Sequence, residues 1–219
     1  SNGEESLYML GMAYYNQGDY ITASHYFTNY YTTYPRGIYT ELARFHSGKA
    51  LFLDTPEPRL DQTTTYKAIQ ELQMFMEYFP NSNRKTDAQL MIFNLQDKLV
   101  MKDYLSAKLY FNLGTYIGNA STTADNRING NNYLACITTA ENALKDYPYT
   151  TMREEISILL LRAKYKLGTE SVEEKKEERM RDAIDEYYAF KNEFPESKYM
   201  KEVESIYKNA SKYVKELND

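Results

Sequence analysis

The apolar positions of this chain repeat in a fixed arrangement ahead of its aromatic–proline pairs. Four of the six prolines directly follow an aromatic residue, namely Pro35, Pro80, Pro148 and Pro195. Twelve residues before each of them stands a small residue: Ala23, Ala68, Cys136 and Ala183. Five residues before each stands Tyr30, Phe75, Ala143 or Phe190. These spacings place the side chains on one helical face. Because proline is disfavoured inside helices, each segment is predicted to be a helix of about four turns that ends before its proline.

A second helical stretch precedes each of these helices. The stretches cover residues 7–15, 42–53, 87–113 and 152–167, and three of them are followed by Gly18, Gly114 and Gly168. Glycine just beyond a helix is a common C-terminal stop. The pattern therefore predicts helical hairpins at about residues 4–35, 39–80, 87–148 and 151–195, and a capping helix at 198–217.

The first hairpin matches the tetratricopeptide signature most closely. The matching positions are held by Leu7, Leu10, Gly11, Tyr14, Gly18, Tyr20, Ala23, Phe27 and Pro35. From Gly11 to the equivalent Gly48 is 37 residues, close to the repeat length of about 34. We therefore predict an all-α tetratricopeptide-repeat fold, in which the hairpins stack into one right-handed solenoid domain over residues 1–219.

Three insertions are expected between paired helices. Residues 54–64 are proline-rich, residues 115–132 are polar and rich in Gly and Asn, and residues 169–178 are charged. The second insertion is predicted to be a mobile loop. From the end of the third insertion into the next helix, residues 173–179 alternate in charge at helical spacing, which favours a solvated helix face with i,i+4 pairs over a docking patch.

Composition argues against nucleic acid as a partner but does not distinguish among protein partners. The 26 basic and 31 acidic residues give a net charge of −5, and no basic stripe of the kind that binds nucleic acid is present. Tyrosine is abundant, at 23 residues, with no tryptophan; it suits both helix packing and wet binding grooves. The apolar runs are too short to span a bilayer. The polar start without methionine suggests an excised fragment whose targeting segment lies upstream.

The sequence offers little that points to catalysis. His25 and His46 lie in no metal-binding motif and are expected to be packed or solvated. Cys136 is the only cysteine and is expected to replace alanine in helix packing, since nothing around it favours a reactive thiolate. With no phosphate loop, nucleophile elbow or paired carboxylates, we predict no catalytic residue, no metal site, no cofactor and no enzyme activity.

The inner face of the stack is the candidate binding surface. In such arrays the first helix of each hairpin lines the concave side, where extended peptides usually lie. The residues expected there are Tyr8, Met12, Tyr15 and Asn16 of the first hairpin and Phe45, Lys49, Phe52 and Leu53 of the second. Two interpretations stay open: these residues bind a ligand, or they pack against a further N-terminal repeat.

Several longer stretches resemble one family. They are DTPEPRLDQTTTYKAIQELQMF (54–75), YFPNS (78–82), LQDKLVMKDYLSAKLYFNLG (95–114), ALKDYP (143–148) and NEFPESKYMKEVESIY (192–207). Over nearly the whole chain they resemble the BamD-type outer-membrane assembly lipoproteins of Gram-negative bacteria. The family's lipid-attachment cysteine and its first repeat are expected to lie outside this sequence.

The resemblance implies a lipid-anchored protein at the periplasmic face of the outer membrane. It would work with a BamA-like insertase and other assembly-complex lipoproteins. The N-terminal repeats would receive unfolded outer-membrane protein segments and the C-terminal repeats, around residues 151–217, would dock the insertase. The alternatives are a Tol-associated envelope coordinator, a generic peptide-binding repeat module, and an enzyme or carbohydrate-binding module on the same helices.

Overall fold

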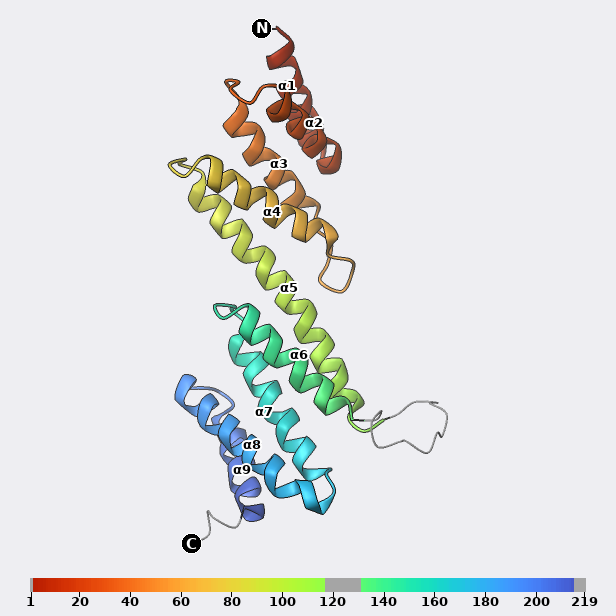
Figure 1. The fold of residues 1–219 in the computed structure, drawn as a ribbon, viewed down its shortest axis with the longest axis vertical. Helices are drawn as coiled ribbons and strands as arrows, with labels where there is room; N and C mark the ends of the chain where they lie inside the picture. The colour runs from red at the N-terminus through yellow and green to blue at the C-terminus, as the bar shows by residue number, and fades with distance from the viewer. Residues whose placement is uncertain (1, 117–130, 215–219) are drawn as a thin grey trace. The chain divides into compact units, whose positions relative to one another are not determined.

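A computed structural model describes residues 2–116 and 131–214. All regular structure in these ranges is helical, which confirms the predicted fold class. The helices are α1 (Asn2–Gln17), α2 (Tyr20–Thr33), α3 (Thr40–Asp54), α4 (Thr63–Tyr78), α5 (Lys85–Leu113), α6 (Asn132–Asp146), α7 (Arg153–Thr169), α8 (Glu173–Glu193) and α9 (Met200–Ala210), with the short 3₁₀ helix η1 (Ser211–Tyr213) after them (Figure 1). The chain divides into two compact units, Ser1–Leu99 and Val100–Asp219, and the boundary falls within α5.

In the first unit, consecutive helices pack as antiparallel hairpins, each against the next (Figure 1). One core cluster joins α1, α2 and α3 through Phe27, Tyr30 and Ala50, all fully buried. A second joins α3 and α4 to the N-terminal half of α5, and there Leu72, Phe75 and Leu95 are fully buried. The predicted pairing of helices holds throughout this unit.

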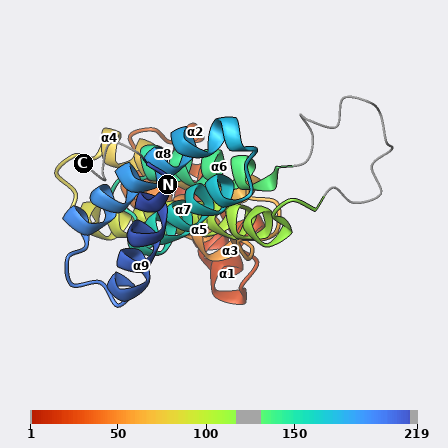
Figure 2. The same cartoon turned by 90° about the horizontal axis from the view of Figure 1, so that it is seen from below.

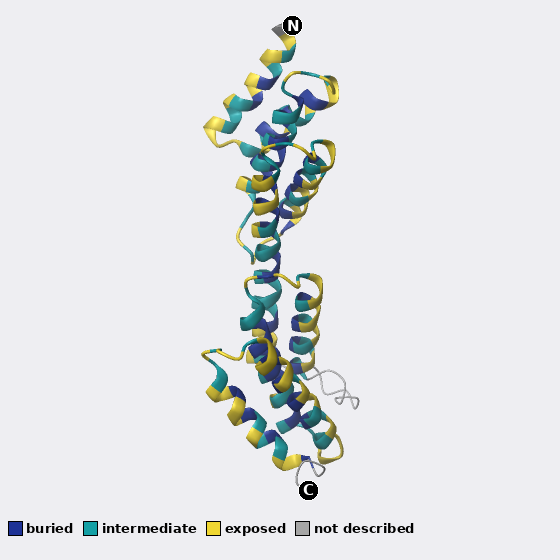
Figure 3. Ribbon diagram, turned by 90° about the vertical axis from the view of Figure 1, so that its left-hand side faces the viewer, coloured by how far each residue is buried: buried dark blue, intermediate teal, exposed yellow. Residues whose placement is uncertain are grey.

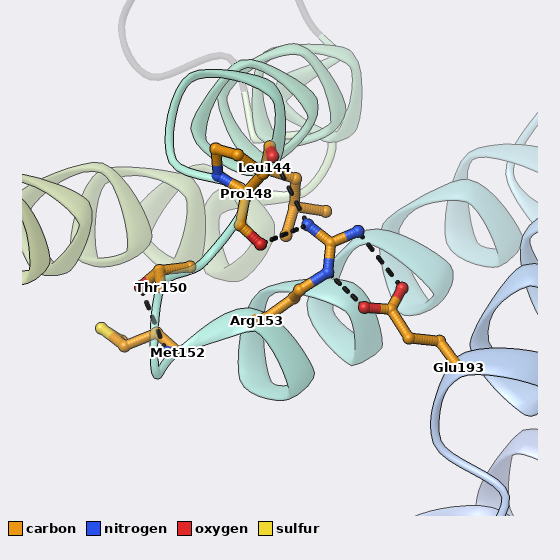
Figure 4. Close-up of polar contacts among 6 residues, drawn as sticks. All are labelled: Leu144, Pro148, Thr150, Met152, Arg153 and Glu193. Atoms are coloured by element: carbon orange, nitrogen blue, oxygen red, sulfur yellow. Dashed lines mark hydrogen bonds and ion pairs between the residues drawn. The ribbon is translucent and has the colours of Figure 1, made fainter.

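In the second unit, α7 is the central helix and contacts α6, α8 and α9, as the views in Figure 1 and Figure 2 agree. At the start of α7, Arg153 fixes three neighbours at once (Figure 4). Its guanidinium donates to the Leu144 carbonyl at 3.5 Å and to the Pro148 carbonyl at 3.3 Å, and it forms a two-pronged pair with the Glu193 carboxylate of α8. One side chain therefore joins the end of α6, the following turn and α8.

The four aromatic–proline turns are nearly identical in structure. The residue before each proline has φ between −122° and −129° and ψ between 60° and 68°, and its N–H bonds to the carbonyl four residues back. The four small residues twelve before the prolines are all fully buried, because their size lets the neighbouring helix come close. Both features confirm the repeat that the spacing predicts.

Two of the three predicted glycine stops are correct. Gly18 and Gly114 follow α1 and α5 with φ of +81° and +53°, a conformation that other residues rarely adopt. The prediction for Gly168 is wrong, because α7 continues to Thr169. Gly168 is buried inside the helix, where an added Cβ would stand 3.0 Å from the Met180 Sδ. The glycine there allows close packing of α8 rather than ending a helix.

The insertions differ from expectation mainly in length. The first is an ordered loop between α3 and α4 whose buried Gln62 amide donates to the carbonyls of Glu57 and Leu60 at 2.8 and 3.1 Å. The third is shorter than predicted, since α8 already begins at Glu173. Within the charged run, Lys176 pairs with Glu173 at i,i+3, and Glu177 pairs at i,i+4 with Arg181, which lies beyond the run. The capping helix ends at Ala210 and η1 follows. Residues 117–130 of the predicted loop and 215–217 of the predicted cap lie outside the described residues.

Candidate functional site

The first candidate site is the face of α1 and α3 that the sequence singles out. Six of its residues retain exposed surface: Met12, Tyr15, Lys49 and Phe52 are half-buried, and Asn16 and Leu53 are exposed. Tyr8 and Phe45 differ, with only 6% and 5% of their surface exposed. These two side chains belong to the core beneath the face, so a ligand would contact the other six.

Tyr8 is held by aromatic neighbours from three elements. Its ring stacks on Tyr39 with 4.5 Å between centroids and lies 5.9 Å from Tyr30. Its hydroxyl lies 3.2 Å from the His46 Nδ1. Phe45 in turn packs on Phe75 of α4, with centroids 5.3 Å apart. The candidate face therefore rests on side chains that are fixed by packing.

His46, for which the sequence predicts no functional role, lies beneath the candidate face among aromatic rings. Its ring lies 5.5 Å from Phe27, 5.7 Å from Phe45 and 5.7 Å from Tyr15, centroid to centroid. Burial, reinforced by the positive charges of Lys49 and Arg84, lowers the pKa of His46 to about 4. The ring is therefore neutral at ordinary pH and acts as a packed aromatic side chain. Packing is thus the outcome for His46, one of the two that the sequence predicts.

Two cations border this face. The Arg84 guanidinium lies 5.9 Å from the centre of the Phe45 ring and 3.8 Å from the Glu41 carboxylate. Lys49 is half-buried on α3 and close enough to His46 to lower its pKa. An aromatic floor with cationic edges can hold an extended segment through apolar side chains and attract acidic ones.

A second candidate face lies within the second unit, between α7 and α9. Two adjoining hollows of about 480 and 420 Å³ share Tyr165, Glu202 and Ile206 in their lining. Phe111, near the end of α5, extends this apolar floor. The sequence predicted a docking region at residues 151–217 without naming side chains, because the groove forms only when α9 packs beside α7.

The rim of the groove is mainly basic. Arg162 is neutralised by Glu202, with both nitrogen–oxygen distances at 2.7 Å. Lys198 pairs with Glu155 at 2.9 Å, and the Tyr199 hydroxyl donates to the same carboxylate. Lys166 and Lys201 also line the groove, and neither is paired with any residue that the structure describes. The groove thus combines an apolar floor with two uncompensated cations.

Reactive groups are few in the part of the chain that the structure describes. No group of three potential metal ligands occurs over residues 2–116 and 131–214. Cys136 is fully buried, and burial raises the pKa of its thiol to about 12. It therefore stays protonated and fills the small-residue position, as predicted. His25 is exposed on α2.

More than half of the chain matches the model of one protein family. The family model YfiO, outer membrane lipoprotein, matches residues 2–125. The chain belongs to this family. The match agrees with the resemblance to BamD-type lipoproteins and with association with the outer membrane. No curated protein matches the chain. Among the described helices, none is both long enough and apolar enough to cross a membrane.

Proposed function

We propose that this protein is a scaffold at the periplasmic face of the outer membrane that helps to assemble β-barrel proteins. It would bind unfolded barrel precursors through the α1–α3 face and a BamA-like insertase, with other assembly-complex lipoproteins, through its C-terminal hairpins. The observation that carries the proposal is an aromatic face on a packed core, in a member of an outer membrane lipoprotein family. Such a protein would act by binding, without catalysis or a cofactor.

Precursor binding rests on the chemistry of the first face. Barrel strands alternate apolar and polar side chains and are rich in aromatic residues near the membrane interfaces. Tyr15 and Phe52 offer half-buried rings at the same relative position on α1 and α3, so an extended segment can place successive apolar side chains on them. Lys49 and Asn16 supply polar contacts beside the rings.

Insertase docking rests on the groove between α7 and α9. Partner surfaces that bind tightly usually bury aromatic or aliphatic side chains and pair charges at the rim. Tyr165 and Ile206 provide the apolar floor, and Lys166 and Lys201 favour an acidic partner surface. The Arg153 contacts join the end of α6, the following turn and α8 to α7, the helix that lines one side of the groove.

Two double variants test the two parts of the proposal, precursor binding and insertase docking. Tyr15→Ala with Phe52→Ala should weaken binding of a labelled ten-residue peptide that alternates aromatic and polar residues, by about tenfold. Lys166→Glu with Lys201→Glu should reduce co-purification of the insertase with the full-length lipoprotein from membranes. Each double variant serves as the matched control for the other. The melting temperature of the lysine variant should stay close to that of the parent chain, because Lys166 and Lys201 are exposed. That of the aromatic variant should fall only modestly, because Tyr15 and Phe52 pack in part against the two core clusters.

Two results would reject parts of the proposal. A steep fall in melting temperature for the Tyr15 and Phe52 variant would show that these rings belong to the core, as in the alternative with a further repeat. Absence of any insertase from membrane preparations of the parent protein would reject the assembly role. If peptide binding then persisted, an envelope coordinator or a general peptide-binding module would be favoured.

A further inference from the structure

A hollow of about 290 Å³ lies in the second unit, between α6 and α8 and beside α7. Its lining consists of Leu134, Ile137 and Glu141 of α6, Lys164 and Leu167 of α7, and Arg179 and Asp182 of α8. An α-helix turns by about 100° per residue, so Lys164 and Leu167 lie on the side of α7 opposite Tyr165 and Lys166 of the α7–α9 groove. The hollow is therefore separate from that groove and from the α1–α3 face.

The apolar part of the lining comes from two helices. Leu167 is buried, Ile137 is half-buried and Leu134 is 47% exposed. Leu134 and Ile137 stand three residues apart, which puts them on one side of α6. Figure 3 shows that the helices of this unit have an exposed side as well as a buried one. These three side chains form an apolar wall (Leu134, Ile137, Leu167) that a ligand can reach from solvent, and such a wall suits the aliphatic part of a ligand.

Both cations of the lining are already engaged. The Lys164 Nζ lies 2.7 Å from the Glu186 carboxylate of α8 and 3.1 Å from the Glu141 carboxylate of α6, so two carboxylates share one ammonium. The Arg179 guanidinium donates to the hydroxyl of Ser171, in the turn between α7 and α8. The end of the hollow at Arg179 is therefore positive, whereas carboxylates outnumber cations around Lys164.

The Asp182 carboxylate differs from the other charged groups of the lining. It forms neither a hydrogen bond nor an ion pair with any residue that the structure describes. Burial has the largest effect on the pKa of Asp182 and raises it, and the charge of Lys164 lowers it. The carboxylates of Glu178, Asp185 and Glu141 raise this pKa further, so negative charge exceeds positive charge here. Because a partly desolvated carboxylate without a partner is destabilising, a cation bound beside Asp182 would be stabilised.

Charge and shape together indicate the ligand. It should carry a cation at one end and an aliphatic chain behind it, and the arginine side chain has both. Its planar guanidinium can contact two carboxylates at once, here those of Asp182 and Glu141, while Arg179 repels a cation from the other end of the hollow. We propose that this hollow binds an arginine side chain of a partner protein, with the guanidinium against Asp182 and Glu141 and the aliphatic stem on the apolar wall.

Methyl-detected NMR of the full chain tests the proposal, because it can measure millimolar dissociation constants. The probe is N-acetyl-arginine N′-methylamide, and its uncharged isostere N-acetyl-citrulline N′-methylamide is the control. Titration with the arginine probe should shift the methyl signals of the apolar wall in a saturable way, and the citrulline probe should not. Asp182→Asn should raise the dissociation constant at least about tenfold. Glu174→Gln removes the same charge from an exposed position of α8 outside the hollow and should leave the dissociation constant within about twofold.

The proposal fails if the methyl signals of the apolar wall do not shift, or if the arginine and citrulline probes shift them equally. Equal dissociation constants for the parent and Asp182→Asn chains would also overturn it. Tighter binding of spermidine than of the arginine probe would do the same, because it would point to a free polyamine as the ligand. Methyl signals far from the hollow check that each variant stays folded. The tests of precursor binding and insertase docking change other residues, so their failure leaves this result unaffected.

Discussion

His46 shows how one side chain can link packing to pH in this fold. It lies among the rings of Tyr8, Tyr15, Phe27 and Phe45, with Lys49 and Arg84 as the charged groups that act on it. A positive charge at this point would be desolvated and repelled by both cations. The sequence predicts no metal site there, and it could not show the ring cluster, because its members come from three helices.

The first prediction concerns acid stability. The unfolded chain protonates His46 near its ordinary pKa of 6.5, while the folded chain holds that pKa at about 4. The stabilising effect of the neutral ring is therefore complete above about pH 6.5 and is lost as the pH falls toward 4. Replacing His46→Phe should reduce the drop in unfolding free energy between pH 7 and pH 4 by on the order of 2 kcal/mol, allowing for the partial exposure of the ring. Urea denaturation across this pH range measures the effect.

His25 supplies the matched control for that experiment. It is exposed on α2 and lies outside the ring cluster, so His25→Phe shows how replacing a histidine by phenylalanine affects acid stability where no ring cluster is disturbed. If the unfolding free energy of the His46 variant and that of the parent fell in parallel with pH, the carboxylates alone would cause the acid sensitivity.

At the scale of the helix, glycine was the least reliable guide to where a helix ends. Glycines after α1 and α5 were recognised as stops because helical periodicity ends there. Gly168 is also followed by a charged stretch, which is typical of an insertion after a helix. The stretch is short, however, because α8 begins only five residues later, at Glu173. Hairpin order and the buried small residues could be predicted from spacing alone, since each repeat buries the same positions. The boundaries and the α7–α9 groove depend on packing between helices, which no local pattern contains.

The second prediction separates two glycines that lie inside helices. An added Cβ at Gly48 would stand 2.8 Å from Leu72 Cδ2 and 3.3 Å from the Leu72 backbone nitrogen. Gly48→Ala should therefore destabilise the chain by about 1–3 kcal/mol through overpacking, despite the better helix propensity of alanine. At Gly168 the neighbours are the thioether atoms of the flexible Met180, so Gly168→Ala should change stability by less than about 1 kcal/mol. Chemical denaturation of the two variants provides the comparison, and equal losses would contradict it.

At the scale of the molecule, α5 joins two sets of contacts. Its N-terminal half packs in the cluster of α3 and α4 through Met91, Ile92 and Leu95. Its C-terminal half contributes Val100 and Ala107 to clusters with α6 and α7. In repeat proteins, stability is close to a sum of local and nearest-neighbour terms. Whether residues 1–219 behave as one domain therefore depends on how far unfolding of one unit spreads along α5 into the other.

Phe75 and Phe190 offer a matched pair to answer that question. Both stand five residues before a proline turn, and both are at most 1% exposed, but they belong to different units. Phe75→Ala and Phe190→Ala should each destabilise their own unit by about 3–5 kcal/mol, because each leaves a cavity in a packed cluster.

With nearest-neighbour coupling, amide hydrogen exchange should lose protection in α3 and α4 for the first variant and in α7, α8 and α9 for the second. Equal loss of protection across all helices in both variants would instead show that α5 transmits unfolding, so that the chain behaves as one cooperative domain. A local response would mean that the two candidate faces can be altered separately, because each unit would keep its own stability.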